Sequence, residues 1–63
     1  MRDQPTLTDD EWMLLIELLE RERRELPAEI HHTRTPTVRD DLRRRLELID
    51  GLLQRLRHVV AAQ

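Results

Sequence analysis

The sequence predicts an all-α protein, an antiparallel hairpin of two helices that associates into a four-helix bundle as a homodimer, or into a higher oligomer. Apolar residues recur at spacings of three, four and seven along two long segments, which is the period of one helical face. Only residues 33–36, Thr-Arg-Thr-Pro, combine strong helix-breaking signals. Association is predicted because a chain of 63 residues without cysteine buries little surface and has no disulfide to compensate.

The first helix is predicted over about residues 9–32, after a flexible tail at residues 1–6 that is mostly polar and has nothing to pack against. Thr8 is followed three residues later by Glu11, which is the spacing of a capping box at a helix start. The apolar stripe of this helix contains Trp12, Leu15, Ile16, Leu19, Leu26 and Ile30.

Pro27 interrupts the first stripe. Proline inside a helix removes one backbone hydrogen bond and crowds the carbonyl four residues back, so the helix either ends at Leu26 or kinks at Pro27. We expect a kink, because Ile30 keeps the phase of the stripe and an end at Leu26 would require an unusually long loop.

The second helix is predicted over about residues 36–60, after a turn at residues 33–35. Thr35 followed by Pro36 is typical of a helix start, with threonine at the N-cap and proline at the first helical position. Two helices of similar length joined by a short turn are expected to lie antiparallel. The second stripe contains Val38, Leu42, Leu46, Ile49, Leu53, Leu56 and Val60.

The two stripes leave other apolar residues beside them. Leu14 and Leu18 flank the first stripe, and Leu48, Leu52 and Val59 flank the second. Ordering about 50 residues costs roughly 75 kcal/mol, which a single seam between two helices is not expected to offset. The predicted oligomer interface consists of Trp12, Leu14, Leu15, Leu18, Leu19, Leu48, Leu52, Leu53, Leu56 and Val59.

Two arginines, Arg23 and Arg45, fall within the apolar stripes and are expected in one layer of the hairpin. Two like charges in one layer need a counter-charge. Glu22 or an acid of the partner copy is the candidate, and such a polar layer would fix the register of the bundle. In the alternative interpretation, both guanidinium groups extend to the surface and the layer contributes little.

Glu29, His31 and His32 are the candidate metal ligands. A glutamate followed three residues later by a histidine places both side chains on one helix face, as in di-iron carboxylate bundles. Further acids would have to come from a second chain. The alternative is that both histidines cap the helix end, where donors suit the free carbonyls. We expect capping, and therefore no metal and no cofactor.

The segment from Arg39 to Arg45 is the only candidate nucleic-acid surface, through Arg39, Arg43 and Arg44. Acidic residues four positions earlier favour an ordinary salt-bridged helix instead. Across the chain, 11 basic and 13 acidic residues give a formal net charge of −2, so nucleic-acid binding is not expected. The apolar runs are also too short to span a membrane, and the N-terminus has no signal-peptide layout, which favours the cytoplasm.

Serine, cysteine, tyrosine and lysine are all absent, so most common nucleophiles are missing and an enzyme is not expected. The Leu-Thr-Asp-Asp-Glu-Trp opening, the Glu-Ile-His-His-Thr-Arg-Thr turn and the arginine-rich second half resemble small uncharacterised bacterial proteins of about this length. That resemblance implies a stand-alone hairpin and no particular chemistry. The predicted function is a non-enzymatic structural or protein-interaction module that binds itself, with a second protein as the alternative partner.

Overall fold

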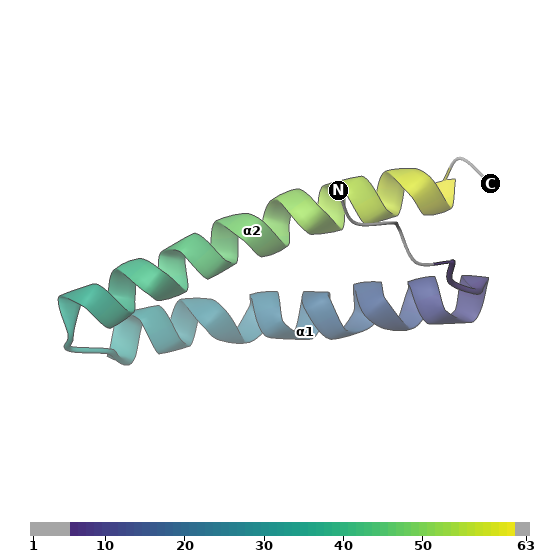
Figure 1. Cartoon of the computed structure of the whole chain (residues 1–63). Helices are drawn as coiled ribbons and strands as arrows, with labels where there is room; N and C mark the ends of the chain where they lie inside the picture. Colours follow the sequence, from purple (N-terminus) through teal and green to yellow (C-terminus); the bar gives the residue numbers. More distant parts are fainter. Residues whose placement is uncertain (1–5, 62–63) are drawn as a thin grey trace.

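The chain folds into two α-helices packed against each other, which confirms the predicted helical hairpin (Figure 1). The computed structural model describes residues 6–61, so the tail expected at residues 1–6 lies outside the described residues except for Thr6. Helix α1 spans Asp9–His32 and helix α2 spans Pro36–Ala61. The chain reverses at residues 33–35, so the two helices run antiparallel.

The start of α1 is the capping box that the sequence predicts. The Glu11 backbone N–H donates to Thr8 Oγ1 at 3.1 Å, and the Thr8 backbone N–H donates to Glu11 Oε1 at 2.8 Å. These bonds satisfy backbone donors at the helix start that have no partner within the helix. Asp9, Asp10 and Glu11 also place negative charge in the first turn, where the helix dipole favours it.

Helix α1 continues through Pro27 and does not end at Leu26. A proline inside a helix costs about 3 kcal/mol. Leu26, directly before it, is 0% exposed, and burying a leucine side chain contributes about 1.5–3 kcal/mol. Leu26 would be helical in either case, so what the continuation through Pro27 adds is the position of Ile30, which is half-buried beside Leu46 of α2.

The turn between the helices is stabilised by hydrogen bonds to backbone carbonyl groups. The Thr33 N–H donates to the Glu29 carbonyl at 3.0 Å, which closes the end of α1. The Arg39 guanidinium reaches back from α2 and donates to the Thr33 carbonyl at 2.8 Å. The Arg39 backbone N–H donates to the Thr35 carbonyl at 3.0 Å, so α2 begins directly after Thr35.

The core between the helices is small and apolar. Its five buried residues are Ile16, Leu26, Ile49, Leu53 and Leu56. Half-buried residues packed against them are Trp12, Leu19, Leu42, Leu46, Leu52 and Val60. Most of these positions belong to the two predicted stripes, so the helical period locates most of the core.

Four residues depart from the predicted stripes. Ile30 is half-buried but is not among the residues packed against the buried cluster. Leu15 and Val38 were expected in the core but are exposed, whereas Leu52 was expected on the flank but packs against the core. Leu15 lies about 100° around α1 from the buried Ile16, which carries it out of the seam. Val38 lies in the first turn of α2, at the end of the hairpin.

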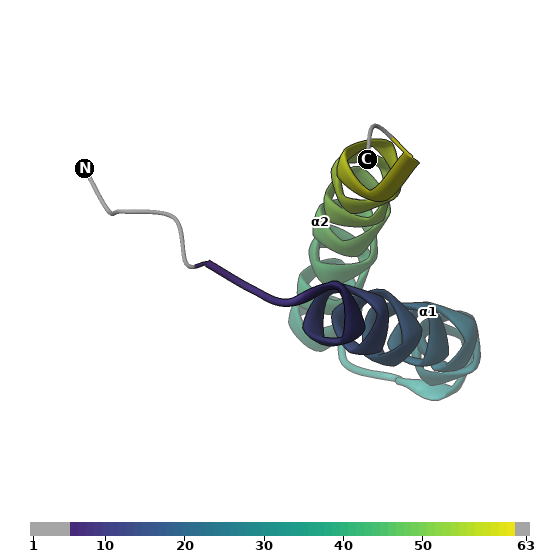
Figure 2. The ribbon, with the colours of Figure 1, turned by 90° about the vertical axis from the view of Figure 1, so that its right-hand side faces the viewer.

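The molecule is a single layer of two helices that diverge away from the turn. Figure 1 shows α2 tilting away from α1 toward the open end, and the end-on view of Figure 2 shows the two axes crossing. The overall extents are 42 × 27 × 15 Å. A helix is about 10–12 Å thick with its side chains, so the shortest extent holds one layer. Within residues 6–61, no further element covers either broad face of the hairpin.

Candidate interaction surface

One broad face of the hairpin is crossed by ion pairs, and we call it the ion-paired face. Arg57 Nη2 lies 2.8 Å from Glu20 Oε2, and the Arg23 guanidinium donates to Asp50. The hollow along this side of the seam is lined by Glu20, Arg23, Arg24, Asp50, Leu53, Gln54, Arg57 and His58. Charged and polar side chains thus cover the seam on this face.

The other broad face carries a groove lined largely by leucine, and we call it the leucine face. Leu18 and Leu48 lie two residues before Glu20 and Asp50, and two residues turn a helix by about 200°. The groove is therefore on the opposite side of both helices. It is lined by Leu18, Leu19, Arg21, Glu22, Glu25, Arg45, Leu48, Ile49 and Leu52.

Large apolar side chains remain open to solvent around this groove. Leu48 is 66% exposed and Leu18 is 51% exposed, and they come from different helices. Leu14, Leu15 and Val59 are exposed as well. Contiguous apolar surface contributed by two elements is typical of an interaction site, whereas single exposed leucines are ordinary.

The predicted interface residues separate into three groups. Leu14, Leu15, Leu18, Leu48 and Val59 are exposed, and Trp12, Leu19 and Leu52 are half-buried. Leu53 and Leu56 are only 2% and 6% exposed, because they form the hairpin's own core. In the single chain, almost none of the surface of these two side chains is left for a second copy to bury.

The two arginines expected in one layer find different partners. Arg45 Nε donates to Glu22 Oε1 at 2.9 Å, as expected, whereas Arg23 pairs with Asp50, which the sequence reading missed. The pairs lie on opposite faces of the hairpin, and both guanidinium groups are exposed. An exposed ion pair contributes about 0–1 kcal/mol, so the surface interpretation of these arginines fits the structure.

Glu29, His31 and His32 are all exposed at the turn end of α1. The two imidazole rings lie edge to face, with their centroids 5.4 Å apart. Within residues 6–61 no group of three or more histidine, cysteine, aspartate or glutamate side chains comes close enough together to hold a metal ion. The described residues of one chain therefore supply an incomplete donor set at this position.

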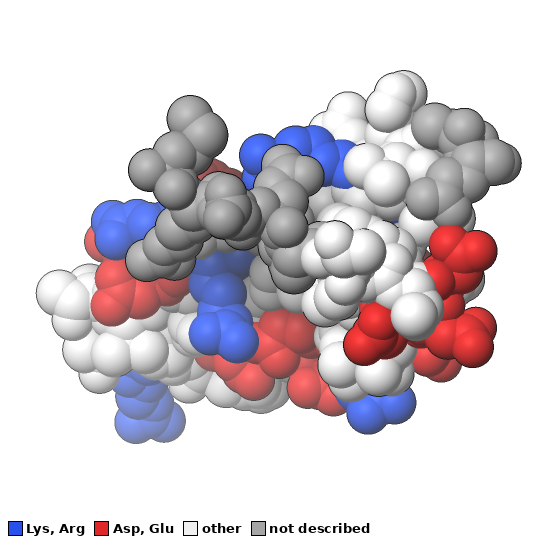
Figure 3. All heavy atoms as spheres, turned by 45° about the vertical axis from the view of Figure 1, so that its right-hand side comes forward, with Lys and Arg blue, Asp and Glu red and all other residues white. Residues whose placement is uncertain are grey.

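The arginines of the candidate nucleic-acid surface each contact an acceptor of the chain. Arg43 Nη1 lies 4.0 Å from Asp40 Oδ1, and Arg44 Nη1 lies 3.8 Å from Asp41 Oδ1. Arg39 donates to the Thr33 carbonyl. Figure 3 shows acidic and basic side chains next to one another across the visible face. The arrangement is that of a salt-bridged helix surface.

The fold defines the protein as a two-helix α-hairpin with one ion-paired face and one leucine face. Neither helix, over the residues described, has an apolar segment of the length that crossing a membrane requires. Comparisons with models of protein families, with curated proteins and with solved structures found no match to this chain.

Proposed function

We propose that the protein is a non-enzymatic structural or protein-interaction module that associates with itself through the leucine face. The observation that carries this proposal is the difference between the two broad faces. Two ion pairs cross the seam on one face, whereas on the other face exposed leucines from both helices border the groove beside a single pair, Glu22–Arg45. A cytoplasmic location, as expected from the sequence, belongs to this proposal.

The free energy of burial supports self-association. Each leucine that is half exposed in the single chain gains about 1 kcal/mol when covered, since complete burial contributes about 1.5–3 kcal/mol. A two-fold dimer buries each such residue twice, because the same patch is used on both copies. Leu15, Leu18, Leu48 and Val59 are sufficiently exposed to contribute in this way.

The size of the core supports it as well. Five of the described residues are buried in the single chain, and the hairpin is only one layer thick. Covering the leucine face with a second hairpin would make a four-helix bundle with a continuous core between the two layers. The apolar side chains at the groove would then become interior residues.

The test is the mass of the protein in solution, measured by sedimentation equilibrium over a range of concentrations. Leu18→Gln is compared with Met13→Gln. The two wild-type residues have nearly equal exposure, 51% and 52%, but Met13 lies one heptad before Glu20, toward the ion-paired face. We expect a wild-type dimer, at least about tenfold weaker association for Leu18→Gln, and little change for Met13→Gln. A wild-type mass of one chain at every concentration would overturn the proposal.

A further inference from the structure

Each helix carries a second stripe beside the core stripe, with residues spaced alternately by four and three. In α1 this outer stripe contains Glu11, Leu15, Leu18, Glu22, Glu25 and Glu29. In α2 it contains Asp41, Arg45, Leu48, Leu52, Arg55 and Val59. Alternation of four and three is the spacing of a helix–helix seam in a coiled coil. Three members of each stripe line the leucine groove, so the two outer stripes border it from opposite sides.

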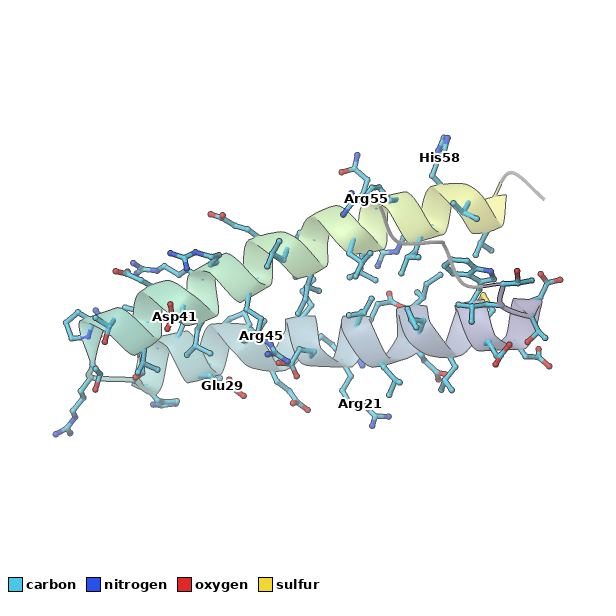
Figure 4. The ribbon with its side chains drawn as sticks, in the orientation of Figure 1. Arg21, Glu29, Asp41, Arg45, Arg55 and His58 are labelled. Carbon is cyan, nitrogen blue, oxygen red and sulfur yellow. The ribbon has the colours of Figure 1, made fainter. Side chains whose placement is uncertain are left out.

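The charges of the two outer stripes have opposite signs. Every charged residue in the α1 stripe is a glutamate. The α2 stripe contains Arg45, Arg55 and Asp41, and the Asp41 carboxylate lies 3.8 Å from Arg44 outside the stripe. Figure 4 shows Arg45 reaching from α2 toward α1, where it binds Glu22. The outer stripe of α1 is thus acidic, although Arg21 also lines the groove beside it, and the outer stripe of α2 is mainly basic.

A second copy can cover the leucine face in two symmetric ways. If the two-fold axis runs along the hairpin, both turns lie at the same end and α1 packs on the partner's α2. If the axis lies across the hairpin, the turns lie at opposite ends, so that α1 packs on the partner's α1 and α2 on the partner's α2. The signs of the facing charges differ between these arrangements.

With turns at the same end, the leucines match when Leu15 faces the partner's Leu52 and Leu18 faces the partner's Leu48. In this register, each residue of α1 faces the residue of the partner's α2 that lies at about the same distance from the turn, because both helices rise by about 1.5 Å per residue. It places Glu11 opposite the partner's Arg55 and Glu22 opposite the partner's Arg45. Opposite charges then flank the leucines at both ends, whereas one layer nearer the turn Glu25 faces the partner's Asp41, whose carboxylate lies 3.8 Å from Arg44 of its own chain.

With turns at opposite ends, the leucines match when Leu15 faces the partner's Leu18 and Leu48 faces the partner's Leu52. The same spacing then places Glu11 opposite the partner's Glu22 and Arg45 opposite the partner's Arg55. Like charges flank the leucines at every position, which disfavours this arrangement.

We infer that the leucine face binds a second copy of this chain with both turns at the same end, α1 of each copy on α2 of the other. This inference rests on the proposed self-association and adds its geometry. The facing glutamates and arginines select the arrangement, and the matched leucines supply the buried area.

The first experiment measures the distance between the two turns. The chain contains no cysteine, so Arg34→Cys in the exposed turn provides one site per chain for a nitroxide spin label. Dipolar spectroscopy should give a distance below about 25 Å, since packed helices lie about 8–10 Å apart. Turns at opposite ends would give about 45 Å, from the rise per residue, and would overturn the inference. A monomeric wild-type mass without dipolar coupling would overturn the proposed function as well, so the two failures are distinguishable.

The second experiment reverses one charge. Arg55→Glu places a glutamate opposite the partner's Glu11, and we expect dimerisation to weaken about tenfold, since two such contacts change sign in each dimer. With turns at opposite ends the same variant would face the partner's Arg45 and strengthen dimerisation, which would contradict the inference. Arg24→Glu makes an equal change of net charge on the ion-paired face and is expected to leave the dissociation constant unchanged.

Discussion

Arg45 of α2 donates to the Glu22 carboxylate of α1 at 2.9 Å, beside the groove of the leucine face. On the opposite face, two such pairs cross the seam, between Arg23 and Asp50 and between Arg57 and Glu20. The contacts between the helices are therefore asymmetric: charge covers one side of a narrow core and mainly apolar surface covers the other.

The Glu22–Arg45 pair is expected to contribute little to the stability of a single hairpin. Both side chains retain solvent contact, and such pairs contribute about 0–1 kcal/mol. Arg45→Gln should therefore lower the free energy of unfolding by less than about 1 kcal/mol in urea titrations at a concentration where the chain is monomeric. Arg21→Gln, whose side chain points away from α2 in Figure 4, is the control and should change less. A loss of several kcal/mol in Arg45→Gln would show that the pair is not solvent-screened.

Leu26 is expected to be among the residues most sensitive to truncation. Its side chain is fully buried, and removing buried methyl groups from leucine costs about 2–5 kcal/mol. Because only five of the described residues form the buried core, Leu26→Ala should abolish the cooperative thermal transition that circular dichroism follows. Leu14→Ala removes the same atoms from an exposed position and should retain the transition. Equal melting curves for the two variants would contradict the packing described.

Thr8 is expected to stabilise the first turn of α1 through its hydroxyl. Thr8→Ala removes the acceptor for the Glu11 N–H, and the loss of such a cap costs about 1 kcal/mol. Amide hydrogen exchange should accelerate in the first turn of α1 and remain unchanged near the turn at residues 33–35. Thr37→Ala, at an exposed position inside α2, is the matched control and should not slow or speed exchange in α1.

Gly51 is expected to be a weak point of α2. A Cβ atom built on this glycine meets nothing within 4 Å, and its backbone does not have a positive φ. Gly51→Ala should therefore raise the free energy of unfolding by roughly 0.5–1 kcal/mol, because alanine favours the helix. The dimer dissociation constant of the same variant, measured by sedimentation equilibrium, tests whether a second chain lies against Gly51. Weaker association would mean that a second chain approaches the backbone there, contrary to the arrangement we infer.

The histidines at the end of α1 are expected to bind no metal stoichiometrically. Glu29, His31 and His32 do not form a group of three ligands, and the described part of the chain brings no other carboxylate or imidazole to complete one. Native mass spectrometry after addition of iron, zinc or manganese should give the mass of the metal-free protein. Retention of one metal ion per two chains, lost in Glu29→Ala, would show that a dimer completes the site.

Local chemistry in the sequence accounts for the helices and their ends. A capping box forms between residues three positions apart, and the helix start at Thr35 and Pro36 depends on two adjacent residues. Neither signal therefore depends on the rest of the fold. The periodicity likewise selects most of the core, including Ile16, Leu26 and Leu53. The same periodicity could not separate the core from the flank where both are apolar, so Leu15 and Leu52 were misassigned.

Sequence by itself determined two amphipathic helices, the turn between them and the presence of surplus leucines beside each stripe. Only the tertiary structure decided which flanks lie on the same side of the seam, that Arg23 pairs with Asp50, and that Leu53 and Leu56 are used within the chain. The physical reason is that hydrophobic burial fixes which stripe faces inward but not the small rotation and tilt of one helix against the other. Those two quantities depend on how all the side chains of the seam fit together.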